Sequence, residues 1–293
     1  MTDLNDAFDK LGWARQHFEA LQREIKPFEE SDKHHITVDI NADAGEYVFY
    51  VHDLEDPKSH WGLLIGDCLH NARTALDYLM VRLDALVTRR DPADIGDIAF
   101  PITRSAKLFS GAKGIANARQ NLAFSGYLTR IEELQPYNIG NVSIWGARDG
   151  SPLIHALPTA LQRLSALDNI DKHRVVHATW GRVDFLESID AVIAFPPGFV
   201  SLPSVWNGAA LENGAEIGQW RFVPPLPSEW TPTQMDMKRS FPLHVAIGDD
   251  SFYGVLDVLD LCLWGVEATL QHFAPVFDGL QPPLPVTAIP NVE

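Results

Sequence analysis

Two short segments of the chain carry side chains whose types and spacing could do chemistry. One lies between positions 67 and 77 and the other between positions 168 and 174. Each holds a histidine, which can accept and return a proton, an arginine, which can hold an anion, and carboxylates that can orient either group. Together they would suit a hydrolase- or nuclease-like reaction with a histidine base and an arginine that stabilises negative charge. The candidate catalytic residues are His70, Arg73, His173 and Arg174.

The same two segments could instead bind a ligand without reacting with it. The first segment presents short hydrogen-bonding side chains and no lysine or glutamate, whereas a solvated helix face usually carries long charged side chains. We therefore expect Asp67, His70 and Asn71 to be mostly buried against a second layer or a cleft. The sequence favours a non-catalytic binding or interaction protein with this polar helix lining a pocket, and the enzyme is the alternative. The candidate ligand-binding residues are Asp67, Asn71, Asp77, Asp171 and Lys172.

Helical periodicity positions the first segment. Residues 59–86 form the longest helix candidate, with Ser59 as its N-cap and one broad apolar face. The second segment lies where a helix over 158–170 ends and a strand begins. A partly buried Asp67 needs a cationic partner, and the later segment is the richest source, so we expect the two segments to meet in space. The apolar face of the first helix comprises Leu64, Ile65, Cys68, Leu69, Ala72, Ala75, Leu76, Leu79 and Leu83.

Metal-binding motifs are weak in this sequence. Asp67 and His70 have the one-turn spacing of helical metal sites, and a closing helix over 253–277 carries acidic residues on one stripe. Di-metal helical bundles need two such carboxylate–histidine pairs, and only one is present. No P-loop, HExxH or glycine-rich dinucleotide motif occurs. The sequence predicts neither a metal nor another cofactor.

Composition and charge narrow the function classes. The chain has 293 residues and a net charge of −16, which argues against general nucleic-acid binding. Its one basic segment, Ile98–Ile131, is interpreted as a solvated helix–loop face. The acidic start lacks a signal peptide, and Asp257 and Asp260 make a membrane span over 252–266 unfavourable. Both cysteines are expected to be buried, reduced thiols, so we predict a cytoplasmic protein. Its expected partner is a small ligand or another protein.

The order of predicted elements gives the fold class. Helices are expected over 6–28, 59–86, 127–134, 158–170 and 253–277, and strands over 35–41, 46–53, 175–186, 188–195, 215–223 and 241–248. The first two strands flank Asp43-Ala44-Gly45, a hairpin signal. This pattern predicts an α+β fold, with helices packed against an antiparallel sheet in a single compact unit. We expect one domain over 1–280 and a disordered, proline-rich tail over 281–293.

Two resemblances rest on the polar segments. Residues 66–79, GDCLHNARTALDYL, and the later DKHR resemble a group of uncharacterised bacterial proteins with the pattern G-D-x-x-H-N-x-R-x-x-L-D and then D-K-H-R. The helix is also distantly similar to HEPN-type helical domains, some of which cleave RNA with an arginine and, after four to six residues, a histidine. Here Tyr78 stands in that place after Arg73. The resemblance implies a helical fold and an HEPN-nuclease-like enzyme as the alternative function.

Overall fold

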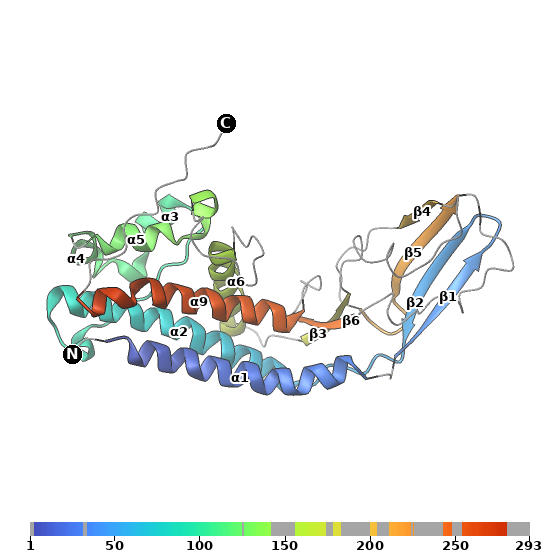
Figure 1. Cartoon of the computed structure of the whole chain (residues 1–293), viewed down its shortest axis with the longest axis horizontal. Helices are drawn as coiled ribbons and strands as arrows, with labels where there is room; N and C mark the ends of the chain where they lie inside the picture. The colour runs from blue at the N-terminus through green and yellow to red at the C-terminus, as the bar shows by residue number, and fades with distance from the viewer. Residues whose placement is uncertain are drawn as a thin grey trace. The chain divides into compact units, whose positions relative to one another are not determined.

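The computed structural model describes residues 3–31, 34–124, 126–141, 156–173, 178–182, 200–203, 211–223, 225, 243–247 and 254–279. These residues form an α+β protein, as the sequence predicts (Figure 1). The α-helices are α1 (Asn5–Glu29), α2 (His60–Thr88), α3 (Ala106–Ser110), α4 (Arg119–Phe124), α5 (Tyr127–Glu133), α6 (Ala156–His173) and α9 (Val255–Phe277). Short 3-10 helices are η1 (Pro92–Asp94), η2 (Lys113–Ile115) and η3 (Pro136–Asn141). The strands are β1 (His35–Asn41), β2 (Glu46–His52), β3 (Ala178–Arg182), β4 (Val200–Pro203), β5 (Glu216–Val223) and β6 (Leu243–Ile247).

The chain divides into two compact units, each built from segments that are distant in sequence. The helical unit comprises residues 1–20, 64–175 and 258–293, and the sheet unit comprises 21–63 and 176–257. Three helices, α1, α2 and α9, contribute residues to both units. Because these continuous helices belong to both units, the division into units does not test the predicted single domain over 1–280. That domain stays a prediction. The predicted tail over 281–293 lies outside the described residues.

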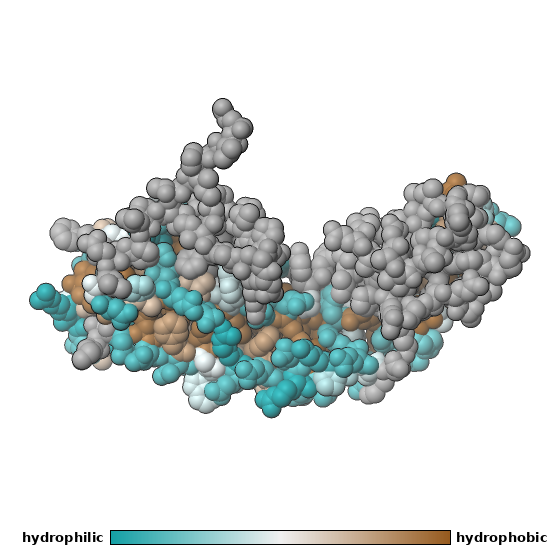
Figure 2. All heavy atoms as spheres, in the orientation of Figure 1, coloured by the Kyte–Doolittle hydropathy of each residue, from teal (hydrophilic) through white to brown (hydrophobic). Residues whose placement is uncertain are grey.

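In the helical unit, α1, α2 and α9 run side by side (Figure 1). Asp6 near the start of α1 accepts from Arg82 of α2, with Nη2 and Oδ2 2.7 Å apart, and Arg15 of α1 lies 2.6 Å from Glu267 of α9. The apolar face predicted for α2 is buried, apart from a half-buried Leu64. Figure 2 shows the result on the visible face, where hydrophobic atoms lie between hydrophilic ones along the helices. Within the described residues, no helix combines the length and apolar character needed to cross a membrane.

In the sheet unit, four strands form an antiparallel sheet in the order β1-β2-β5-β4. Buried and half-buried side chains alternate along β2, as expected for a strand with one face on a core. The predicted hairpin is confirmed, with His35 opposite His52 and Asn41 opposite Glu46. Gly45 has a φ of 67°, and a side chain there would collide with the Phe222 carbonyl oxygen of β5. Both facts explain a glycine at this turn.

A second ladder in the sheet unit pairs β3 with β6 in antiparallel register. Trp180 of β3 stacks on Phe28 and donates its indole N–H to the Glu55 carbonyl at 2.7 Å. The strand β4 was not predicted, because four residues ending in proline give too short an alternating pattern. The strand predicted over 188–195 lies outside the described residues.

Candidate functional site

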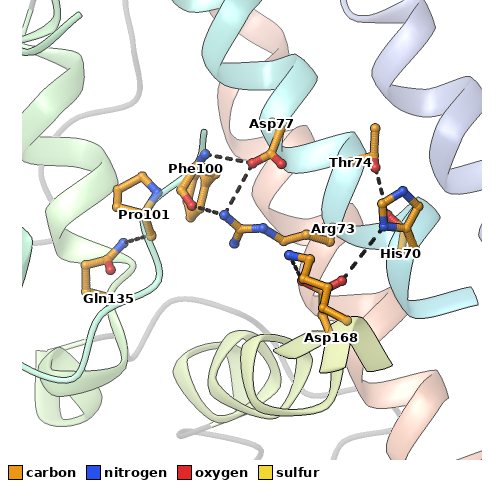
Figure 3. A network of polar contacts seen from close by, with 9 residues as sticks. His70, Arg73, Thr74, Asp77, Phe100, Pro101, Gln135 and Asp168 are labelled. Carbon is orange, nitrogen blue, oxygen red and sulfur yellow. Dashed lines mark hydrogen bonds and ion pairs between the residues drawn. The ribbon is translucent and has the colours of Figure 1, made fainter. Parts of the chain in front are cut away.

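The polar face of α2 is bound to the chain segment that follows the helix. The Arg73 guanidinium donates to the Phe100 carbonyl oxygen and pairs with Asp77, whose Oδ1 lies 3.3 Å from Nη2. The same Asp77 oxygen accepts the Phe100 backbone N–H at 2.8 Å. Arg73 and Asp77 therefore take both backbone polar groups of Phe100, and we call these three residues the clamp (Figure 3). The Arg73 side chain is only 15% exposed, so this arginine is engaged inside the protein.

Burial and ion pairing have opposite effects on the pKa of Asp77 in the clamp. Burial raises the pKa of Asp77 above its ordinary value, and the Arg73 charge and the Phe100 N–H oppose that shift. A half-buried carboxylate that meets both a cation and a backbone donor is suited to holding a segment in place. The clamp thus has a structural role that accounts for two of the predicted site residues.

A second anchor holds the same segment from the end of α5. Gln135 is fully buried, and its Oε1 accepts the Thr103 backbone N–H at 2.9 Å and the Thr103 hydroxyl at 3.2 Å. Its Nε2 donates to the carbonyl oxygens of Pro101, at 2.8 Å, and Ile131, at 3.0 Å. Gln135 and the clamp together fix residues 100–103 against α2 and α5 (Figure 3).

The fixed segment forms one wall of a pocket of about 500 Å³ in the helical unit. That size lies within the usual range for small-molecule sites. The described lining residues of this pocket include none from α2, which instead holds the segment that forms this wall. That the polar helix itself lines a pocket stays a prediction. This wall comprises Ile102 and Thr103 of the fixed segment and then Arg104, Leu108, Gly111 and Ala112, with Pro136 also lining the pocket.

The opposite wall is one face of α6. Gln162, Ser165, Ala166 and Asn169 line the pocket, and their spacing of three, one and three residues places them on one side of a helix. Leu161 and Leu164 are buried in the core. The sequence predicted this helix, but it did not point to the pocket residues. The amide and hydroxyl side chains that recur between the leucines are the feature of the sequence that could have indicated a polar pocket wall.

The two predicted polar segments meet beside this pocket-lining helix, as expected from the sequence. Asp168 of α6 is 3% exposed, and its Oδ2 accepts from the Lys172 ammonium at 2.6 Å. Its Oδ1 lies 4.0 Å from Nδ1 of His70 on α2 and has no hydrogen-bond partner among the described residues (Figure 3). An imidazole backed by a buried carboxylate could accept a proton, which is the chemistry that the sequence suggested for His70.

The predicted burial of this turn of α2 is wrong for two of its three residues. Asp67 is exposed, the His70 side chain is 63% exposed, and Asn71 is half-buried. The clamp covers the polar face only further along the helix, so the side chains of Asp67 and His70 stay open to solvent. Asn71 donates to the Asp67 carbonyl at 2.8 Å and accepts from the Lys10 ammonium of α1 at 3.3 Å. Arg174 and the side chain of His173 lie outside the described residues.

The contact between Gly66 and Asp171 supplies a test of how α2 and α6 pack. A β-carbon at Gly66 would lie 2.8 Å from Cγ of Asp171, whose pKa is raised by burial and by the charges of Asp168 and Asp67. We expect Gly66→Ala to stabilise an Asp171→Ala background by about 1 kcal/mol, the helix-propensity gain. With Asp171 present, that gain should be lost because the carboxylate must move.

Urea unfolding of the four variants gives this coupling energy. Gly12→Ala in α1 is the matched control, since nothing lies within 4 Å of a β-carbon there, and it should stabilise by about 1 kcal/mol. Equal effects of Gly66→Ala with and without Asp171 would contradict the packing described.

Within the described ranges, no three histidine, cysteine or acidic side chains are grouped so that they could hold a metal ion. Glu267, one of the acidic residues on the stripe of α9, forms an ion pair with Arg15 of α1. Cys68 and Cys262 are free and buried, as predicted, and burial raises the pKa of both thiols.

Comparison with known proteins finds no matching family model, curated protein or solved structure. The two resemblances noted in the sequence therefore stay predictions.

Proposed function

We propose that the protein is a non-catalytic binding protein whose pocket, between α6 and residues 102–112, takes a small polar ligand. The observation that carries this proposal is the pocket of about 500 Å³ with amide and hydroxyl groups on one wall and Leu108 on the other. Leu108 is 57% exposed, and an exposed leucine in a concave polar site is suited to covering the apolar part of a ligand.

The rigidity of the pocket wall supports the same proposal. The clamp and Gln135 hold residues 100–103 through backbone hydrogen bonds, so the wall is formed before any ligand arrives. A preformed site binds with less loss of conformational freedom. The polar helix contributes to binding indirectly in this proposal, by positioning the segment that contacts the ligand.

The alternative is a hydrolase- or HEPN-nuclease-like enzyme. The His70 imidazole, exposed and close to the buried Asp168 carboxylate, favours it. Of its two proposed anion stabilisers, Arg73 is occupied by Phe100 and Asp77, and Arg174 lies outside the described residues. His70 is also absent from the described lining of the pocket. The binding proposal accounts for more of the polar residues and is preferred.

Ligand-observed NMR with a library of amino acids, sugars, nucleosides, carboxylic acids and phosphate monoesters tests the proposal. We expect compounds that bind wild type and fail to bind Ala166→Phe or Asn169→Trp, because both substitutions fill the pocket from α6. Ala123→Phe is the matched control, since Ala123 is exposed on α4 and does not line the pocket. It should retain binding.

Two results would contradict the binding proposal. One is a library in which no compound depends on Ala166 or Asn169 for binding. The other is conversion of a bound compound to product that stops in His70→Ala, which would support the enzyme. Circular dichroism of each variant shows that the fold is kept.

A further inference from the structure

The charge of the pocket differs from that of the whole chain. The protein carries a net charge of −16, yet the described lining contains no aspartate or glutamate and does contain Arg104. Arg104 is exposed, and the structure pairs it with no acidic residue among those it describes. An arginine in a concave site without a carboxylate partner is available to a ligand.

The neighbouring cations fall into two groups. Two of the arginines in the basic segment 98–131 are used internally: Arg119 donates to the Phe109 carbonyl at 2.6 Å, and Arg130 lies 3.2 Å from Glu133. Arg104 and two lysines on the same stretch of chain remain exposed. The cationic surface beside the pocket is therefore concentrated between positions 104 and 113. The two exposed lysines are Lys107 and Lys113.

We propose that the ligand of this pocket is a small organic anion whose carboxylate or phosphate group is bound by Arg104. This inference rests on the proposed function, because it names the ligand class of the same pocket. The planar guanidinium fork matches both carboxylate and phosphate oxygens, which is why the two groups share this site chemistry. Leu108 and Ile102 cover the carbon skeleton of the anion.

The facing wall supplies what an anion needs beyond one charge. Gln162 and Asn169 of α6 carry amide groups that can donate to the remaining anion oxygens, and Ser165 adds a hydroxyl. The exposed lysines at 107 and 113 raise the local concentration of anions without having to touch them. Their effect is screened by salt beyond about 8 Å at physiological ionic strength, so specificity depends on Arg104.

Titrations of the full chain at physiological salt test the inference with matched pairs of compounds. The probes are succinate and glucose 6-phosphate, and their neutral counterparts are succinamide and glucose. At least one anion should bind at least about tenfold more tightly than its neutral counterpart, as expected for charge-assisted hydrogen bonds. Which anion binds distinguishes a carboxylate ligand from a phosphate ligand.

Substitution of the arginine separates specific binding from general attraction. Arg104→Gln should weaken anion binding by about tenfold to a hundredfold, the range expected for losing hydrogen bonds to a charged group. Arg89→Gln removes the same charge from an exposed position outside the pocket lining and should leave binding within about twofold. Thermal unfolding of both variants checks that each is folded.

The possible failures are distinguishable. Neutral compounds that bind as well as the anions, and lose binding in Ala166→Phe, would overturn the anion inference and leave the binding function standing. Equal losses in Arg104→Gln and Arg89→Gln would also overturn it, because the attraction would be general. If neither anion binds, the anion inference fails, and if in addition no compound of the NMR library depends on Ala166 or Asn169 for binding, both proposals fail.

Discussion

Replacing Gln135 with leucine should lower the free energy of unfolding by about 3 kcal/mol or more. Leucine has nearly the same size, so the loss comes from hydrogen bonding. The Thr103 N–H and the carbonyl oxygens of Pro101 and Ile131 would each lose a partner that Gln135 supplies at 2.8 to 3.0 Å. Leaving a buried backbone group unpaired costs roughly 1–3 kcal/mol, and several groups are affected together.

Urea denaturation of wild type and Gln135→Leu measures this loss. Gln16→Leu is the matched control, since Gln16 is exposed on α1, and it should change stability by less than about 0.5 kcal/mol. Gln135→Leu should also bind pocket ligands more weakly, because Gln135 holds Pro101 and Thr103, and Ile102, Thr103 and Arg104 line the pocket. Equal denaturation midpoints for the two variants would show that the anchor contributes nothing.

Acidification should destabilise the protein through His272, by on the order of 3 kcal/mol at full effect. Burial on α9, and then the nearby Arg130 charge, lower the pKa of His272 from 6.5 to about 4. The native state therefore holds this imidazole neutral while the unfolded chain takes up a proton below about pH 6.5. The unfolded state binds more protons in that window, so stability rises with pH. The contribution is present above pH 6.5 and is lost as pH falls toward 4.

The comparison of His272→Leu with wild type isolates this effect. The difference in unfolding free energy between the two proteins should change between pH 6.5 and pH 4 and stay level above that range. His17→Leu, at a half-buried position on α1, controls for the loss of an imidazole. The comparison with wild type is needed because burial raises the pKa of Asp77 and of Glu29, which opposes the effect of His272. Parallel stability curves for wild type and His272→Leu would contradict the prediction.

Local sequence patterns determined most of the secondary structure. The apolar stripe of residues 59–86 places its side chains at helical spacing, and the structure buries that stripe along α2. The alternation around Asp43-Ala44-Gly45 likewise predicted the first hairpin, which the structure confirms. Such patterns suffice because each helix or strand must bury one apolar face, and the repeat of that face differs between the two. The two polar segments also meet as predicted, but through His70 and Asp168, whereas the prediction was argued from a buried Asp67 that the structure leaves exposed.

Only the tertiary structure decided what the polar residues do. The sequence identified Arg73 and Asp77 as polar groups on a helix, but their partner, Phe100, contributes backbone atoms whose position no side-chain pattern encodes. The same limit applies to Gln135, which holds backbone groups from two segments. The pocket is formed by α6 and residues 102–112, which are more than forty residues apart in sequence. The reason is physical: periodicity reports which face of an element is buried, whereas the packing of whole elements determines which polar groups meet.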